Sequence, residues 1–310
     1  MATTNTTPAQ ATGAAPQPEP PKPFSMLLLA SDGTPGAEGA IVMARLLAER
    51  DKARVHVLTV VEPLPVITPE VSLPLPPEVE EARRTELAQR VREQLLRVAP
   101  GASAWDIELV EGVPDATIVR TAREDHAGAI VVGLGEHRMV DRLFGGETAL
   151  RLIRMADVPI LAAAPGATTL PTHAMAAVDF SETGNLAIRA ALPLLAPDAT
   201  LTLVHVVARD ISLGAWPAWD DAYLKAVNAS FDLLKSQLRL PPGVTVNTVV
   251  LRGDPPGELL AWASQHKVDL LVTGSHGHNF VVRTLLGRVS TKLVRGARCS
   301  VLIAPPRLRA

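Results

Sequence analysis

The 310-residue chain lacks features that several classes of protein require. Its single cysteine, Cys299, excludes an internal disulfide and a cysteine-based zinc site. No uninterrupted apolar stretch reaches the ~18 residues of a membrane span. The formal net charge is −2 and no run of lysine and arginine occurs, so the electrostatic signature of a nucleic-acid-binding protein is missing. We therefore expect a cytoplasmic protein that binds neither membranes nor nucleic acid.

The beginning of the chain also lacks an apolar pattern. Residues 1–23 are rich in proline, alanine and threonine, and they have neither the basic start nor the apolar middle of a secretory signal. A segment of this composition has too little apolar surface to bury for folding. We predict a disordered tail over residues 1–23.

The rest of the chain repeats itself. The segment "VVGLGEHRMVDRLFGGETALRLIRMADVPILAAAP", which begins at residue 131, aligns with "VTGSHGHNFVVRTLLGRVSTKLVRGARCSVLIAPP", which begins at residue 272. Gly133 aligns with Gly274 and Gly146 with Gly287, in each case 141 residues later. Near the start of each copy, "MLLLASDGTPG" resembles "HAMAAVDFSETG". The chain is therefore a tandem duplication.

Each copy alternates short strand-like runs with helical patterns. Runs such as "RVHVLTVV" and "TLTLVHVV" suit buried strands, and the segments between the runs have helical periodicity. This alternation predicts an α/β protein made of two tandem doubly wound five-stranded parallel-sheet sandwiches, with domains over residues 24–167 and 173–310. In such folds ligands bind beyond the carboxyl ends of the strands, where the strand order reverses.

The segment "GSHGHNFVVRTLLGRVS" in the second copy contains a candidate binding loop. Gly274 and Gly277 follow the predicted fourth strand, and Gly287 precedes a helical pattern. A loop that leaves a strand and opens a helix presents backbone N–H groups at the positive end of the helix dipole, where anions bind. The spacing matches neither the Walker A loop nor the dinucleotide fingerprint. The residues alone leave two interpretations, a phosphate site and a tight turn.

Four stretches together resemble the universal stress protein family. They are "AVDFSETG" after the first strand of the second copy, "LVHVV" in its second strand, "GSHG" followed nine residues later by Gly287, and the closing "CSVLIAP". The resemblance covers nearly all of residues 24–306, and it implies a sandwich of the adenine nucleotide alpha hydrolase type. In the nucleotide-binding branch of the family, ATP lies across the carboxyl edge of the sheet and a G-x2-G-x9-G-[ST] loop holds its phosphates.

Carried onto this chain, the resemblance implies a set of contacts with ATP. Val178 and Asp179 would lie near the ribose and base, and the backbone of Val206 would meet adenine. The phosphates would be held by three loop glycines and by the backbone that follows them, namely Gly274, Gly277, Gly287, Val289 and Ser290. Mg²⁺ could accompany the nucleotide.

The chain departs from the family pattern in both copies. Arg288 stands where the second copy should have a hydroxyl residue, and it could pair with phosphate, fill the pocket or point to solvent. In the first copy, Glu136 replaces the second glycine and Glu147 replaces the hydroxyl residue. Carboxylates at a helix N-terminus occupy the place of an anionic ligand. We therefore expect ATP in the second copy only.

The leading hypothesis is a stress-response protein that binds an adenine nucleotide, without catalytic residues or a metal site of its own. One alternative is a protein-interaction module of the same fold that binds no nucleotide. The other is a slow ATPase that uses Asp179 with Mg²⁺. Family members commonly pair through their last strands, so residues 159–163 and 300–304 are expected to pack as an intramolecular pseudo-dimer, and a homodimer is a further option.

Overall fold

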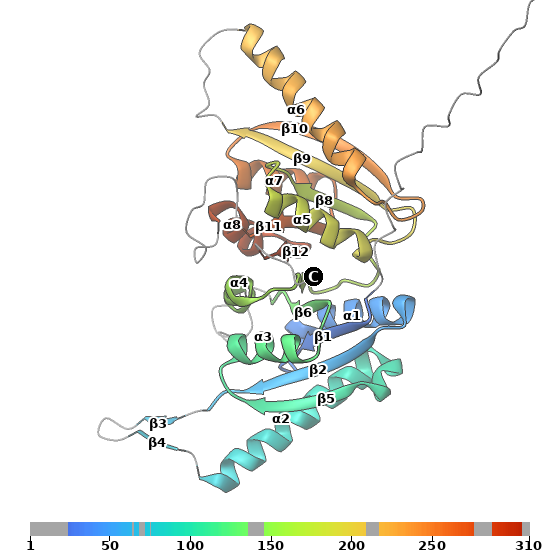
Figure 1. Cartoon of the computed structure of the whole chain (residues 1–310). Helices are drawn as coiled ribbons and strands as arrows, with labels where there is room; N and C mark the ends of the chain where they lie inside the picture. The colour runs from blue at the N-terminus through green and yellow to red at the C-terminus, as the bar shows by residue number, and fades with distance from the viewer. Residues whose placement is uncertain are drawn as a thin grey trace, which may run out of the picture.

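The computed structural model describes residues 24–63, 65–67, 72–74, 76–135, 146–208, 217–275 and 287–305. The predicted tail over residues 1–23 lies outside these ranges, as does Gly277. The chain folds into two α/β sandwiches that follow one another in sequence, so the predicted fold class is confirmed (Figure 1).

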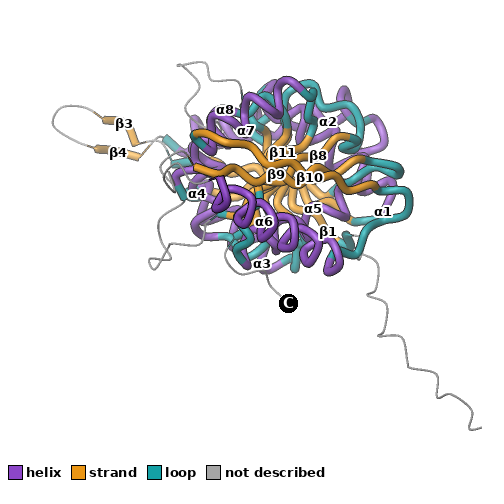
Figure 2. Tube along the Cα trace, turned by 90° about the horizontal axis from the view of Figure 1, so that it is seen from above, coloured by secondary structure: helices purple, strands orange, loops and turns teal. Residues whose placement is uncertain are grey.

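In the first half, the described residues form a parallel sheet in the order β5-β2-β1-β6-β7. Its strands are β1 (Met26–Ala30), β2 (Arg54–Val61), β5 (Asp106–Glu111), β6 (Ala129–Gly133) and β7 (Ile160–Ala163). The helices are α1 (Glu38–Asp51), α2 (Pro77–Val98), α3 (Pro114–Glu124) and α4 (Gly146–Met155), with short 3-10 turns η1 (Pro35–Ala37) and η2 (Pro100–Ala104). A hairpin of β3 (Pro65–Ile67) and β4 (Ser72–Pro74), which follows β2 and precedes α2 in the sequence, projects from the body (Figure 2).

The second half repeats this topology in the order β10-β9-β8-β11-β12. Its strands are β8 (His173–Ala177), β9 (Thr200–Ala208), β10 (Thr245–Gly253), β11 (Leu270–Gly274) and β12 (Ser300–Ala304). The helical elements are α5 (Glu182–Ala191), η3 (Leu192–Leu194), α6 (Pro217–Gln237), α7 (Pro255–Gln265) and α8 (Arg288–Gly296). No helix in the described ranges has the length and apolar character that crossing a membrane requires.

The central strands are mostly apolar because helices cover both faces of the sheet. Every residue of β1, β11 and β12 is buried. One apolar cluster lies on each face of the sheet, and each cluster runs through both halves. The first holds residues from α1, α2, α5 and α6, and the second from α3, α4, α7 and α8; one residue of each is, in that order, Leu47, Leu95, Ile188, Phe231, Ile118, Leu150, Leu259 and Leu293.

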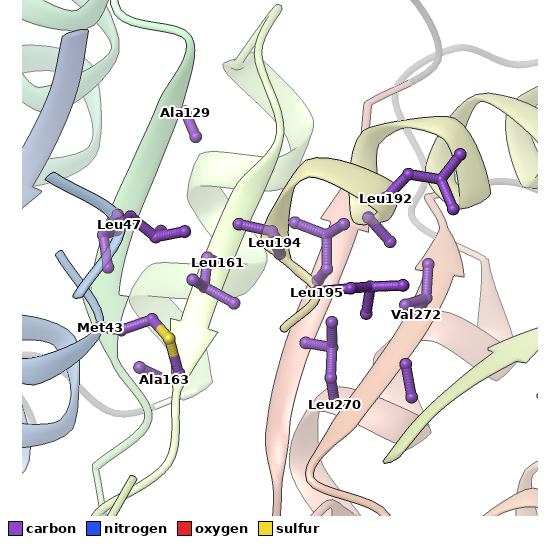
Figure 3. Packing of buried hydrophobic residues seen from close by; sticks show 14 of the residues in the cluster. Met43, Leu47, Ala129, Leu161, Ala163, Leu192, Leu194, Leu195, Leu270 and Val272 are labelled. Atoms are coloured by element: carbon purple, nitrogen blue, oxygen red, sulfur yellow. The ribbon is translucent and has the colours of Figure 1, made fainter. Parts of the chain in front are cut away.

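The two halves join through their last strands. β7 pairs antiparallel with β12, with Leu161 opposite Leu302, so the strands form one ten-stranded sheet. The two stretches expected to pack against each other are thus hydrogen-bonded neighbours. Figure 3 shows Leu161 with Leu47 of α1 on one side and Leu194 of η3 on the other. The guanidinium of Arg50 also crosses the junction and donates to the carbonyl oxygen of Leu195 at 3.0 Å.

Candidate functional site

The candidate site lies beyond the carboxyl ends of β8 and β11. β8 has β9 on one side and β11 on the other, so the chain leaves β8 in one direction and returns from β10 to its opposite side. In folds of this kind, ligands bind at the carboxyl edge of the sheet where the strand order reverses in this way. This reversal is the switch point of the second half, where the ligand-binding residues were predicted from the sequence.

The loop after β8 is held by the carboxylate of Asp179. Its Oδ1 atom accepts hydrogen bonds from the backbone N–H of Ser181 at 3.0 Å and from the Ser181 hydroxyl at 2.6 Å. Ser181 in turn accepts from the N–H of Gly184 at 3.1 Å and caps α5. Among the described residues, none donates to Oδ2 of Asp179, so this oxygen remains available to a ligand.

The first half builds the same turn with Asp32. Its Oδ1 atom accepts from the backbone N–H of Thr34 at 2.9 Å and from the Thr34 hydroxyl at 2.7 Å. The aspartate after the first strand thus shapes a turn in both copies. Its presence in the sequence has a structural reason that is independent of any nucleotide.

Gly274, at the end of β11, lies against the first turn of α5. A Cβ atom at this position would lie 3.0 Å from the backbone nitrogen of Gly184 and 3.0 Å from the carbonyl group of Thr183. In the first half, a Cβ atom at Gly133 would lie 2.1 Å from the carbonyl oxygen of Gly36. Close approach of backbone to backbone therefore accounts for this glycine in both copies. The sequence left two interpretations of this glycine, a phosphate site and a tight turn. The structure adds a third reason, the packing contact with α5.

At the start of α8, the serine side chain is hydrogen-bonded within the protein, whereas no side chain caps the backbone N–H groups of the first turn. The Ser290 hydroxyl is buried and donates to the carbonyl oxygen of Gly274 at 2.7 Å, which ties α8 to the end of β11. Gly287 is the N-cap residue; it provides no side-chain cap, and the first turn has no acidic residue. Arg288 is exposed, which disfavours the option that it fills the pocket.

Val206 is half-buried in β9 and lies next to an aromatic cluster. The neighbouring His205 ring contacts the carbonyl oxygen of Val178 through Nδ1 at 2.7 Å and the Tyr223 hydroxyl through Nε2 at 3.1 Å. The Phe180 ring centroid lies 5.1 Å from that of His205. Both imidazole nitrogens are satisfied, so His205 joins the end of β8 to β9 and α6 and is a structural residue.

Sequence reasoning did not nominate Gly184, which links the two loops of the site. A Cβ atom at Gly184 would lie 2.8 Å from Oδ1 of Asp179, and its nitrogen lies against Gly274. Glycine is unfavourable inside a helix, so its presence in the first turn of α5 was a signal of close approach.

Three residues named in the sequence analysis lie outside the described positions or side chains. Gly277 lies outside the described residues, as does Glu136 in the first half, and the side chain of Glu147 is not described. Within the described ranges, no three His, Cys, Asp or Glu side chains gather as a metal ion would require. The structure does bring together the ends of β8, β9 and β11 and the start of α8, which carry the other nominated residues.

Comparison with known proteins agrees with the duplicated fold. The model of the universal stress protein family matches residues 24–163 and again residues 172–305. A universal stress protein of Mycobacterium tuberculosis is 26% identical over 292 residues, which cover 90% of this chain and 95% of its own length. One from Thermus aquaticus is 32% identical over 140 residues, which cover 44% of this chain and 97% of its own.

Solved structures show the same architecture. The crystal structure of a universal stress protein from Archaeoglobus fulgidus superposes with a TM-score of 0.60, covering 91% of this chain and 98% of that chain at 16% identity. At this identity the likeness speaks for the fold alone. The family match, in contrast, spans both sandwiches. The chain therefore belongs to the universal stress protein family and carries two copies of its domain in tandem.

Proposed function

We propose that the second half binds ATP as a structural or regulatory ligand in a stress-response protein of the cytoplasm. The observation that carries this proposal is the start of α8 at the switch point. The N–H groups of Arg288, Val289 and Ser290 occupy its first turn, where no carbonyl within the helix can accept from them. With no side-chain cap and no acidic residue, this turn suits phosphate oxygens.

The remaining nominated residues fit the other parts of a nucleotide. Oδ2 of Asp179 can accept from a ribose hydroxyl while Oδ1 keeps its turn. Val178 follows the end of β8 and Val206 lies in the neighbouring β9, where the base would sit. The exposed guanidinium of Arg288 can donate to phosphate oxygens in place of the missing hydroxyl. Gly274 and Gly287 frame the loop, and Mg²⁺ would enter with the phosphates.

The first half is proposed to bind no ATP. Glu147 aligns with Arg288, which stands 141 residues later; Glu147 is the second residue of α4 and Arg288 the first of α8. A carboxylate there opposes the charge of a triphosphate, whereas the guanidinium of Arg288 complements it. We propose domains over residues 24–167 and 173–310, with one nucleotide per chain.

Calorimetric titration of ATP into the full chain tests the proposal. We expect one site, weakened about tenfold by Arg288→Glu, because this substitution replaces an attractive charge with the carboxylate of the first half. Gly277→Glu, which copies Glu136, should also weaken binding. Arg239→Glu, at an exposed site after α6, is the matched control and should bind like the intact chain.

The other outcomes select the alternatives. If ATP releases no heat with the intact chain, the interaction module without nucleotide is favoured. Stronger binding by Arg288→Ser than by the intact chain would show that the arginine blocks the site. Phosphate release from ATP that disappears in Asp179→Asn would support a slow ATPase and refute a purely structural ligand.

A further inference from the structure

A cavity of about 490 Å³ opens between α7 and α8, away from the candidate nucleotide site. Its floor is apolar and includes the buried Ala263, Val268 and Leu271. Lys267 and Arg298 line it as exposed residues. Half-buried Cys299, the single cysteine of the chain, also lines it. The volume is within the range of small-molecule sites.

In the first half, an ion pair bridges the equivalent place. There Arg123 reaches from α3 to the turn after α4, with Nε 3.1 Å from Oδ2 of Asp157. Its Nη2 atom donates to the carbonyl oxygen of Met155 at 2.9 Å. A bulky side chain from the third helix thus spans the space between the two helices.

The residues 141 positions later are different in kind. Ser264 stands for Arg123, and Arg298 stands for Asp157. The alignment is supported by the backbone, because His126 and Lys267, which also correspond, both have positive φ, of 55° and 50°. The second half therefore loses the side chain that crosses the gap and gains a cation where the first half has the acceptor.

The two cations of this cavity have no acidic partner in the described part of the chain. No described carboxylate forms an ion pair with Lys267 or Arg298. The negative charge of the Asp269 carboxylate helps to raise the pKa of the Cys299 thiol. This carboxylate already accepts hydrogen bonds from the backbone N–H groups of Thr172 and His173, at distances of 2.8 to 3.1 Å. The cavity thus combines an apolar floor with positive charge.

We propose that this cavity binds a small organic carboxylate with an apolar body. The carboxylate would pair with Lys267 and Arg298, and the apolar body would lie over Val268 and Leu271. The proposal is limited to the second half, because the Arg123–Asp157 ion pair spans the equivalent space in the first half. It is independent of the proposed nucleotide site, which lies beyond the carboxyl end of β11.

Cys299 provides a reporter for occupancy. The rate at which the full chain reacts with 4,4′-dithiodipyridine, an uncharged disulfide, is measured at pH 9 with and without octanoate. Octanoate has a carboxylate and an apolar body, 1-octanol has the body alone, and acetate has the carboxylate alone. We expect octanoate to slow the thiol reaction, because it would cover Cys299 when it occupies the cavity. At equal concentration, 1-octanol and acetate should slow the reaction far less.

Variants locate the charge contacts. Lys267→Asn and Arg298→Asp should each weaken octanoate protection by about fivefold, the factor that corresponds to about 1 kcal/mol of ion pairing. Ser264→Arg combined with Arg298→Asp re-creates the first half's ion pair and should abolish protection. Arg239→Asp removes a distant cation and should change nothing. Each variant is compared with itself without octanoate, and circular dichroism checks that it is folded.

Three results would overturn the proposal. One is a thiol reaction in the intact chain that octanoate does not slow. Another is protection by 1-octanol equal to that by octanoate, which would show an apolar cavity without anion preference. The third is unchanged octanoate protection in both Lys267→Asn and Arg298→Asp. Binding of octanoate is measured in parallel by saturation-transfer NMR, so that a folded variant with a slow thiol still gives a result.

Discussion

A side chain added to the glycine that ends β6 or β11 should destabilise the protein, and the loss of stability should be larger for Gly133 in β6 than for Gly274 in β11. In Gly133→Ala, the added Cβ atom would lie 2.1 Å from the carbonyl oxygen of Gly36. In Gly274→Ala, it would lie 3.0 Å from the nitrogen of Gly184. Gly101, which has nothing within 4 Å of such an atom, provides the matched control.

The expected costs follow from how far the backbone must move. Ordinary contact begins at 3.4 Å, so the first half must shift by more than an ångström and the second by a few tenths. Overpacking costs ~1–3 kcal/mol and sometimes more, which gives about 3 kcal/mol for Gly133→Ala and about 1 kcal/mol for Gly274→Ala. Gly101→Ala should gain about 0.5 kcal/mol, because it restricts the unfolded chain.

Hydrogen exchange read by mass spectrometry measures these costs locally, peptide by peptide. At 1.4 kcal/mol per factor of ten, amides of β6 should exchange about a hundredfold faster in Gly133→Ala, and those of β11 about fivefold faster in Gly274→Ala. Gly101→Ala should exchange no faster than the intact chain. The packing explanation fails if Gly274→Ala keeps full protection of β11 and yet loses ATP binding, because the glycine would then serve the ligand alone.

Two further predictions concern single side chains of the second half. Ser290→Ala should leave ATP affinity within about twofold, because the hydroxyl already donates to Gly274 and only the backbone N–H is offered to phosphate; calorimetry that shows a tenfold loss in a folded variant would identify the hydroxyl as a ligand contact. Burial raises the pKa of the Cys299 thiol from 9.0 to about 11, and the carboxylate of Asp269 adds to the effect. The unfolded chain therefore loses this proton first, and stability should fall as the pH rises from 9 through 11, relative to Cys299→Val, which carries the residue of the first half. Urea unfolding at pH 8, 9, 10 and 11 checks this, and parallel curves for the two proteins would contradict it.

The architecture of this chain was predictable because it depends on repeated patterns. The apolar runs that became β1, β11 and β12 are buried along their full length, and such runs between helical segments indicate a covered parallel sheet. The duplication was readable from glycines 141 residues apart, and the switch point follows from the topology.

The structural reasons for the residues at the site were less predictable, because these reasons are contacts between segments that are distant in the sequence. Nothing local to Gly274 reveals that the backbone of Thr183 lies against it. The link from Ser290 to the Gly274 carbonyl spans sixteen positions, and the sequence gives the hydroxyl no orientation. The cavity between α7 and α8 was not predicted for the same reason, because residues from 260–271 and 296–299 line it together and the sequence does not show how they pack.

The antiparallel junction of β7 and β12 also affects how far the sequences of the two halves can diverge. Two separate chains joined in this way would part on dilution, and every substitution would appear on both sides of the axis at once. Here the partner surfaces are tethered, so the junction is insensitive to protein concentration. One covalent chain can then keep its shared sheet while the copies diverge, as they have done at Asp157 and Arg298, so that a symmetric scaffold carries asymmetric surfaces.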